Sequence, residues 1–324
     1  MFHYEPKDLS VPEVHRLLLG GVGPRPIALV STISKNGILN LSPFSFFNAF
    51  GANPPIIAFS PSRRGRDGSL KDTYNNLQEA PECVVQAVTY EMVEQINLAS
   101  TEYPPEVNEF EKSGLTPIES DLVKPKRVKE SPFQMECILR DIFSYGNGGA
   151  SANIAVCEVV KFHIAEDIFR EGIIHPDLIN LVARMSGEFY TRANGDSIFV
   201  IKRPNQKRGI SYDQLPNFMK LSHVFSANNL AKFANVTSIP TEEDAAKFIR
   251  EIESLKFENF EISEEAIKRY ERDKEYIKML KALITLKNQN KIIVKHRLEI
   301  CAKIALESGD TDFAWKAALY SNTK

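Results

Sequence analysis

Hydroxyl, basic and acidic side chains gather in two short stretches of the sequence: Ser60, Ser62 and Arg63, then Lys71, Asp72 and Thr73. Cations and hydroxyl donors of this kind can surround a phosphate dianion, and the second stretch adds the backbone amides of a helix start. A carboxylate facing a phosphate would be repelled, so Asp72 is expected to cap the helix or to orient Lys71. The two stretches therefore predict a phosphate-binding loop.

Two further arginines, Arg64 and Arg66, lie inside the same loop. They fit a role in phosphate binding and a role on an exposed surface loop equally well. The ligands that the pattern favours are Ser62, Arg63, Lys71 and Thr73.

Residues 1–205 have the pattern of short strands and turns. The apolar runs are separated by Gly, Pro and Asn, and Asn36–Gly37 is a favoured hairpin pair. Two longer runs, at 133–143 and 154–164, predict a long hairpin. With about six strands and short helices between them, the pattern predicts a mainly β domain folded as a small closed barrel.

The pattern changes near residue 205. A polar segment with Pro204 and Gly209 is typical of a linker. Beyond it, Thr241 and Ser263 are each followed by acidic residues, as at the start of a helix. We therefore expect two domains, 1–205 and an α-helical C-terminal region over 206–324.

Composition gives no reason to expect nucleic acid or a membrane as partner. The net charge is −2, with 43% hydrophobic and 25% charged residues. No apolar stretch approaches the roughly 20 residues that span a bilayer. The first residues, MFHYEPKDLS, lack the basic and apolar regions of a signal peptide. These features predict a soluble, cytoplasmic protein.

Cysteine and histidine are too scattered to indicate a metal site. The four cysteines form no Cys-x-x-Cys pair, and no two of the six histidines have the helical spacing of a zinc site. We expect the cysteines to be small buried hydrophobic residues.

Four segments in series resemble the flavin reductase-like, split-barrel family: PRPIALVST at 24–32, NLSPFSFFN at 40–48, PPIIAFS at 54–60 and KDTYNNL at 71–77. Residues 184–190, RMSGEFY, are similar to a late Arg-x-x-Gly-x-x-Tyr segment of that family. The resemblance covers residues 8–205. It implies an FMN-binding split barrel, usually a homodimer with the flavin near the subunit interface.

The resemblance also implies which residues hold the flavin ring. The isoalloxazine is a flat apolar plate with a polar edge, which hydroxyls and backbone amides can bind. The residues expected to do so are Ser31, Thr32, Ser45, Phe46, Phe47 and Asn48, with Thr32 and Asn48 at the ring edge. The alternative for Ser45 and Asn48 is that they cap a turn after Pro43.

The resemblance implies NAD(P)H-dependent reduction of the flavin, by hydride transfer from nicotinamide C4 to flavin N5. This chemistry needs stacked rings and no general acid or base. Arg184 and Tyr190 are the candidates near the ring or across the subunit interface. One departure from the family is Asn153, where members often carry His, so nicotinamide contacts in that strand are not carried over.

Two readings of the whole protein remain open. One is the flavin reductase, with a partner monooxygenase or redox protein. The other is a flavoredoxin-like electron carrier that holds FMN and does not use NAD(P)H itself. The helices after residue 209 lie outside the resemblance, and we expect them to cover the barrel, extend the dimer interface or shield the flavin.

Overall fold

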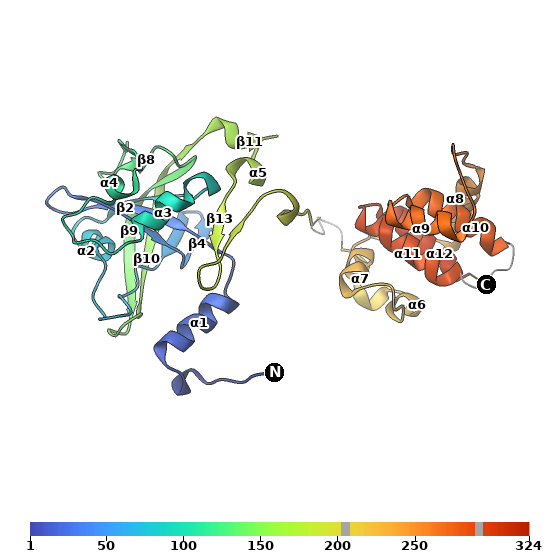
Figure 1. Ribbon diagram of the computed structural model, residues 1–324, viewed down its shortest axis with the longest axis horizontal. Helices are drawn as coiled ribbons and strands as arrows, with labels where there is room; N and C mark the ends of the chain where they lie inside the picture. The colour runs from blue at the N-terminus through green and yellow to red at the C-terminus, as the bar shows by residue number, and fades with distance from the viewer. Residues whose placement is uncertain (202–207, 289–293, 324) are drawn as a thin grey trace. The chain divides into compact units, whose positions relative to one another are not determined.

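The computed structural model of the chain describes residues 1–201, 208–288 and 294–323. The chain divides into two compact units, Met1–Val200 and Ile201–Lys324. Strands dominate the first unit and helices the second (Figure 1). The expected boundary between residues 205 and 206 lies outside the described residues.

An antiparallel sheet of seven strands, in the order β3-β2-β6-β9-β10-β5-β4, forms the centre of the first unit. The strands are β2 (Ala28–Ile33), β3 (Leu39–Phe44), β4 (Phe47–Ala52), β5 (Pro55–Phe59), β6 (Glu82–Gln86), β9 (Phe133–Tyr145) and β10 (Ala152–Ile164). β3 pairs with β2 and β4 pairs with β5, so these two consecutive strands form opposite edges of the sheet. The expectation of a mainly β unit with helices is confirmed, but the barrel is split where the pattern alone suggested a closed one.

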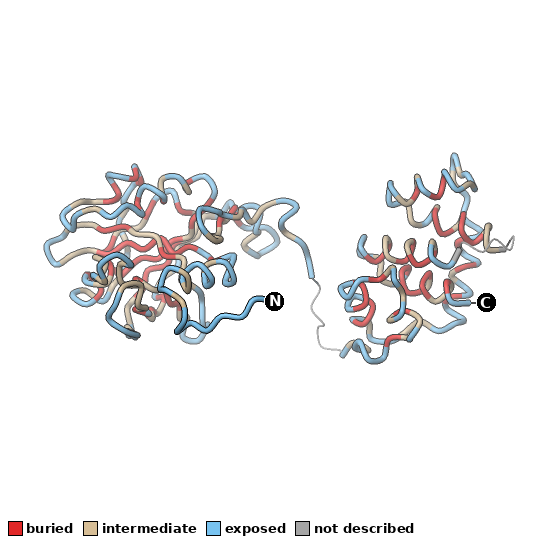
Figure 2. Tube along the Cα trace, turned by 60° about the horizontal axis from the view of Figure 1, so that its bottom comes forward, coloured by how far each residue is buried: buried red, intermediate tan, exposed pale blue. Residues whose placement is uncertain are grey.

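Strand β2 shows why the sequence at 26–33 is apolar almost throughout. Ala28 and Val30 belong to one buried cluster, whereas Ile27 and Leu29 belong to another on the opposite side. Successive side chains of a strand point to opposite faces, so a strand buried on both faces has no polar alternation. Figure 2 shows how the buried residues of this unit concentrate along its strands.

The predicted long hairpin is confirmed as β9 and β10, which pair from Phe133–Ile164 at one end to Tyr145–Ala152 at the other. Two register shifts interrupt the ladder, between Val156 and Cys157 and between Val159 and Lys161. Shifts of this kind bend a strand and increase its twist. The hairpin can therefore belong to the curved sheet at its centre and project beyond it at its tip.

Smaller elements surround the sheet: β1 (Arg25–Pro26), β7 (Pro117–Ile118), β8 (Arg127–Val128), β11 (Phe169–Arg170), β12 (Ile173–Ile174), β13 (Val182–Arg184), β14 (Tyr190–Arg192), α1 (Val11–Gly21), α2 (Asp72–Glu79), α3 (Val93–Ala99), α4 (Glu109–Ser113) and α5 (Pro176–Ile179). The strands β1, β13 and β14 form a separate three-stranded sheet. Helix α1 begins with a capping box of Ser10 and Glu13, as Pro12 in its first turn suggests. None of its residues is buried.

All four cysteines are buried and free, as expected. Cys83, Cys137 and Cys157 come from the neighbouring strands β6, β9 and β10 and belong to one core cluster. The Sγ atoms of Cys83 and Cys157 are 4.0 Å apart. Hydrogen bonds from Cys137 and Cys157, together with burial, raise the pKa of the Cys83 thiol.

The described helices of the second unit are α6 (Asn217–Lys220), α7 (Ala227–Ala234), α8 (Glu242–Ser254), α9 (Glu264–Arg272), α10 (Tyr276–Asn288), α11 (Val294–Glu307) and α12 (Thr311–Ser321). Thr241 and Ser263 cap α8 and α9, which confirms both predicted helix starts. The core includes Trp315, which is 1% exposed and donates its Nε1–H to the Phe233 carbonyl at 3.1 Å. This unit has a hydrophobic core of its own.

Candidate functional site

The predicted phosphate-binding residues lie in one loop that leaves β5 and ends in helix α2. The hydroxyl oxygens of Ser60 and Ser62 are 2.9 Å apart. Arg63 donates from Nη1 to the Gly68 carbonyl at 2.9 Å, which folds the loop back on itself. Ser60, Ser62, Arg63 and Lys71 are all partly accessible. The loop therefore brings hydroxyls and two cations to one part of the surface.

Two donors in this loop have unused capacity. The Arg63 Nε atom is buried and has no hydrogen-bond partner in the described part of the chain. Among the described residues, no hydrogen bond or ion pair reaches Lys71 Nζ, which lies 5.9 Å from the ring centre of Phe44. Burial, and secondarily the positive charge of Arg64, lowers the pKa of Lys71. A bound anion would give both donors an acceptor and would raise the pKa of Lys71 again. The loop therefore fits a phosphate group.

Of the two roles expected of Asp72, capping helix α2 is wrong, and orienting Lys71 stays a prediction. Helix α2 has Lys71 at its N-cap and no side-chain capping bond, and Asp72 is its first residue. Asp72 instead pairs with Arg64, at 3.0 Å between Oδ2 and Nη2. Arg64 also lies 3.6 Å from a carboxylate oxygen of Glu102, and the exposed Arg66 pairs with the same residue. Arg64 and Arg66 are thus already neutralised by carboxylates.

Thr73 and Thr32 meet inside the unit through a cluster of buried polar side chains. The Asn40 amide donates to Thr32 Oγ1 at 2.9 Å and to Thr73 Oγ1 at 3.0 Å. The Asn76 amide donates to Thr32 Oγ1 at 3.0 Å. The cluster ties the start of α2 to β2 and β3, so it sets where the loop ends. Both hydroxyls keep their own hydrogen for a further acceptor.

Ser31 faces away from this cluster. It is fully buried, and its hydroxyl donates to the Lys126 carbonyl. Ser31 and Thr32 are adjacent on a strand, so their side chains point to opposite faces of the sheet.

The segment 45–48 lies beside the loop at 60–73. The Phe46 carbonyl accepts a hydrogen bond from the Ser60 amide at 2.9 Å, and Phe47 pairs with Phe59 in the β4–β5 ladder. Ser45 is half-buried, Phe46 and Asn48 are exposed, and Phe47 packs against the barrel core. The Asn48 side chain accepts from the Ala49 amide at 2.8 Å. This segment offers exposed apolar and polar groups next to Ser60.

Arg184 and Tyr190 form a pair across the β13–β14 ladder. The guanidinium lies 4.5 Å from the ring centre of Tyr190 and donates to its hydroxyl. The buried Arg25 holds this sheet to α1, because it donates to the carbonyls of Leu19, Val22 and Met185. In the described part of the chain, no hydrogen bond or ion pair joins Arg184 or Tyr190 to the loop at 60–73.

The profile of one protein family, described as the flavin reductase like domain, matches residues 21–182. The chain belongs to the flavin reductase-like family. The matched residues lie within the first unit and include the loop at 60–73, Thr32 and the segment 45–48. An uncharacterised protein of Halalkalibacterium halodurans is 39% identical over 201 residues, which are 61% of this chain and 95% of that protein.

Solved structures of similar proteins agree with this family. Nitrilotriacetate monooxygenase component B from Bacillus cereus is 34% identical, with a TM-score of 0.58 over 62% of this chain and 98% of that one. The 2-nitrobenzoate 2-nitroreductase of Pseudomonas fluorescens is 26% identical, with a TM-score of 0.54 over 62% of this chain and 96% of that one. A putative flavin reductase with a split barrel domain, from Shewanella frigidimarina, is 22% identical with a TM-score of 0.53, covering 63% of this chain and 100% of that one, and shares the fold. None of the described helices is long and apolar enough to cross a membrane.

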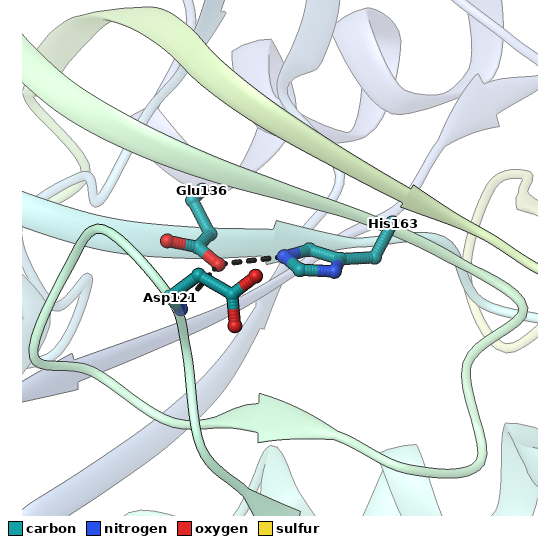
Figure 3. A group of neighbouring side chains, drawn as sticks. All are labelled: Asp121, Glu136 and His163. Carbon is teal, nitrogen blue, oxygen red and sulfur yellow. Dashed lines mark hydrogen bonds and ion pairs between the residues drawn. The ribbon is translucent and has the colours of Figure 1, made fainter.

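This flavin reductase-like chain has a second polar cluster, which sequence reasoning missed: Asp121, Glu136 and His163 (Figure 3). The fully buried Glu136 carboxylate accepts hydrogen bonds from the amides of Asp121, Leu122 and Val123, at 2.8, 2.6 and 3.1 Å. His163 Nε2 lies 2.6 Å from Glu136 Oε1 and must donate, because a carboxylate only accepts.

These three ligand atoms lie within 4.8 Å of one another, as a metal site requires. Their charges are already compensated, however. The Asp121 carboxylate pairs with the Lys161 ammonium, and both Glu136 oxygens already accept two hydrogen bonds. The cluster therefore fixes the loop at 121–123 to the base of the long hairpin through hydrogen bonds and an ion pair within the protein. A charged residue inside the apolar run at 133–143 was the signal for it.

A pocket of about 440 Å³ lies in the second unit, outside the family match. Its lining mixes apolar and charged groups and includes His223, Glu271, Lys274, His296, Lys303 and Glu307. Glu271 pairs with Arg297, and Glu307 accepts from the Asn229 amide at 3.2 Å. The pocket contains no residue of the loop at 60–73.

The Glu136 cluster predicts a loss of stability in acid. Burial alone would raise the pKa of Glu136, but the amide hydrogen bonds and His163 outweigh it and lower the pKa. The carboxylate therefore stabilises the fold fully above its unfolded pKa of about 4.3, and this contribution is lost as the pH falls through the lower folded value. We expect Glu136→Gln to reduce the unfolding free energy by about 3 kcal/mol at pH 7.

Urea unfolding of both proteins at pH 7, 5, 4 and 3 measures this difference. It should shrink as the wild-type carboxylate becomes protonated. A difference that stays constant between pH 7 and pH 3 would contradict the assigned role of the charge.

Proposed function

We propose that the chain binds FMN and acts as an NAD(P)H-dependent flavin reductase. The observation that carries the proposal is the pair of cations at Arg63 and Lys71 beside the hydroxyls of Ser60 and Ser62, because the Arg63 Nε–H and the Lys71 ammonium have no acceptor among the described residues. A phosphate dianion would supply those acceptors through charge-assisted hydrogen bonds. The family match supports the flavin as the molecule that carries this phosphate.

The remaining predicted residues are proposed to hold the flavin ring. Phe46 and Asn48 are exposed on the segment that the Phe46–Ser60 hydrogen bond fixes beside the loop. The Thr32 side chain is 1% exposed and accepts two amide hydrogen bonds, so in this proposal it acts indirectly, by tying β2 to the start of α2. Ser31 and Asp72 act indirectly in this proposal, because both side chains already have partners in the protein.

A bound flavin supplies a ring that accepts a hydride from the nicotinamide of NADH or NADPH. The protein holds the two rings in contact and needs no general acid or base for that step. Arg184 and Tyr190 present a cation and an aromatic face at the surface, as expected of residues that contact the ring, the nucleotide or a second subunit. Because the proposed donor is a cytoplasmic metabolite, we place the reaction in the cytoplasm.

The flavin reductase proposal predicts a coloured protein that its electron donor bleaches. We expect purified protein supplied with FMN to show flavin absorbance, and anaerobic NADH or NADPH to remove it within seconds to minutes. The nucleotide that acts faster identifies the donor. Persistent absorbance with both nucleotides would instead support the electron carrier, and absence of FMN binding would exclude both flavin functions.

The phosphate assignment predicts a specific loss of FMN affinity. Two charge-assisted hydrogen bonds contribute about 1.5–3 kcal/mol each, so the double variant Arg63→Met, Lys71→Met should weaken FMN binding by at least about 100-fold. The matched control is Lys35→Met, Lys112→Met, which removes two exposed charges from the same unit. Flavin fluorescence quenching measures both dissociation constants, and equal FMN affinity in the two double variants would refute the assignment.

We also propose that the protein is a homodimer in which a second copy covers α1. This helix has apolar residues on its surface and none of its residues is buried, with Leu17 and Leu18 about half exposed (50% and 49%). His15 lies edge-on to Phe46, at 6.3 Å between ring centres, so α1 and the start of β4 share a face. Phe50, which is 70% exposed, extends the apolar surface along β4.

Light scattering should therefore give twice the mass of one chain. Leu17→Glu with Leu18→Glu should shift the protein toward monomer, because a dimer interface would bury the new charges. A wild-type monomer at micromolar concentration would contradict this proposal.

A second protein could take up the electrons of the reduced flavin. The similar Bacillus cereus protein is named as component B of a monooxygenase. We propose a partner monooxygenase or redox protein as the final user of the reduced flavin. The helical second unit lies outside the family match, which ends at residue 182.

A further inference from the structure

The tip of the long hairpin forms backbone hydrogen bonds with the loop at 60–73. The Arg63 amide donates to the Ser151 carbonyl at 2.9 Å, and the Arg63 carbonyl accepts from the Ala150 amide at 3.2 Å. Both backbone groups of Arg63 are therefore bonded to residues about 90 positions later in the chain. The direction in which the Arg63 side chain leaves the backbone depends on the hairpin.

The approach of the two segments is close enough to require glycine. A Cβ atom built on Gly149 would lie 2.5 Å from the Gly65 carbonyl oxygen, a distance that no side chain tolerates. The neighbouring Gly148 has nothing within 4 Å of the same built atom. Gly149 thus fits tightly against the loop, whereas Gly148 faces open space.

A buried side-chain amide at the start of β10 also bonds to the loop. Asn153 is fully buried, accepts the Ser144 hydroxyl at 2.8 Å and donates to the Pro61 carbonyl at 3.2 Å. Pro61 lies between the two serines whose hydroxyls meet. The Ser144 bond orients the amide so that its NH₂ group faces the loop. Asn153 therefore holds the serine side of the loop, as Ala150 and Ser151 hold the arginine side.

We propose that Asn153, with the hairpin tip at 149–151, is the positioning element that lets this chain discriminate a flavin with a 5′-phosphate from one without it. The inference rests on the proposed FMN binding. A dianion is bound strongly only by donors that are fixed before it arrives, because ordering mobile side chains opposes binding. Asn153 does not touch the ligand in this proposal; it acts through Ser60, Ser62 and Arg63.

The test compares FMN with riboflavin, which has the same ring and no phosphate. Dissociation constants of both are measured by fluorescence quenching for the full wild-type chain and for Asn153→Leu. We expect the variant to lower the ratio of the riboflavin constant to the FMN constant by about tenfold. Riboflavin binding itself should change less than threefold.

Gln134→Leu is the matched control. Gln134 is also a buried amide on this sheet, and it donates to the carbonyls of Val128 and Ser131 near the opposite end of the hairpin. Both substitutions should lower the thermal unfolding midpoint, but only Asn153→Leu should change the ratio. A residue with a merely structural role would lower both affinities together or neither.

A second pair of variants keeps the test decisive if Asn153→Leu does not fold. Gly149→Ala should lower the ratio by displacing the loop, and Gly148→Ala should leave it unchanged. If folded Asn153→Leu and Gly149→Ala both have the same ratio of riboflavin to FMN dissociation constants as the wild type, the inference is overturned and the proposed function is not. Failure of the wild type to bind either flavin would overturn the proposed function and this inference with it.

Discussion

The first unit depends on the hydrogen bonds between the long β9–β10 hairpin and two loops, at 121–123 and at 60–73. Its middle supplies two neighbouring strands of the central sheet. Near its base, Glu136 accepts hydrogen bonds from the amides of the loop at 121–123 and from His163, and its tip bonds both backbone groups of Arg63. Both loops are irregular and would otherwise leave polar backbone groups unpaired. One hairpin thus orders two irregular loops, one near its base and one at its tip.

Much of this fold follows from the sequence by elementary rules. The turn predicted at Asn36–Gly37 does join β2 to β3, but its loop has three residues, 35–37, so the ladder pairs Thr32 with Asn40, whereas a two-residue turn would have placed Thr32 opposite Leu41. A polar residue opposite another inside two apolar strands indicates a buried polar contact. The capped starts of α8 and α9 are equally local signals, because Thr241 and Ser263 act on amides within three residues. Local patterns succeed where the partner is close in sequence.

The site could be predicted less fully from the sequence, because its contacts join residues that are far apart in the chain. The residue types of the loop indicate an anion, but the partner of Asp72 is not encoded nearby by any spacing rule. Arg64 reaches Asp72 because residues 63–68 fold back, and that fold depends on the hairpin tip far along the chain. Asn153 drew notice only as a departure from a family pattern. Its bond to Pro61 follows from the tertiary approach of two segments.

Each unit contains at least one buried thiol whose reactivity can report the opening of its core. Cys83, Cys137 and Cys157 lie between strands of the barrel, whereas Cys301 lies in the core of the helical unit. Burial raises the pKa of Cys301 as well, so all these side chains are protected from alkylating reagents while the cores are closed. Reaction of the three barrel thiols reports separation of β6, β9 and β10, and reaction of Cys301 reports opening of the helices. The natural sequence thereby allows the order in which the two units unfold to be followed without an added probe.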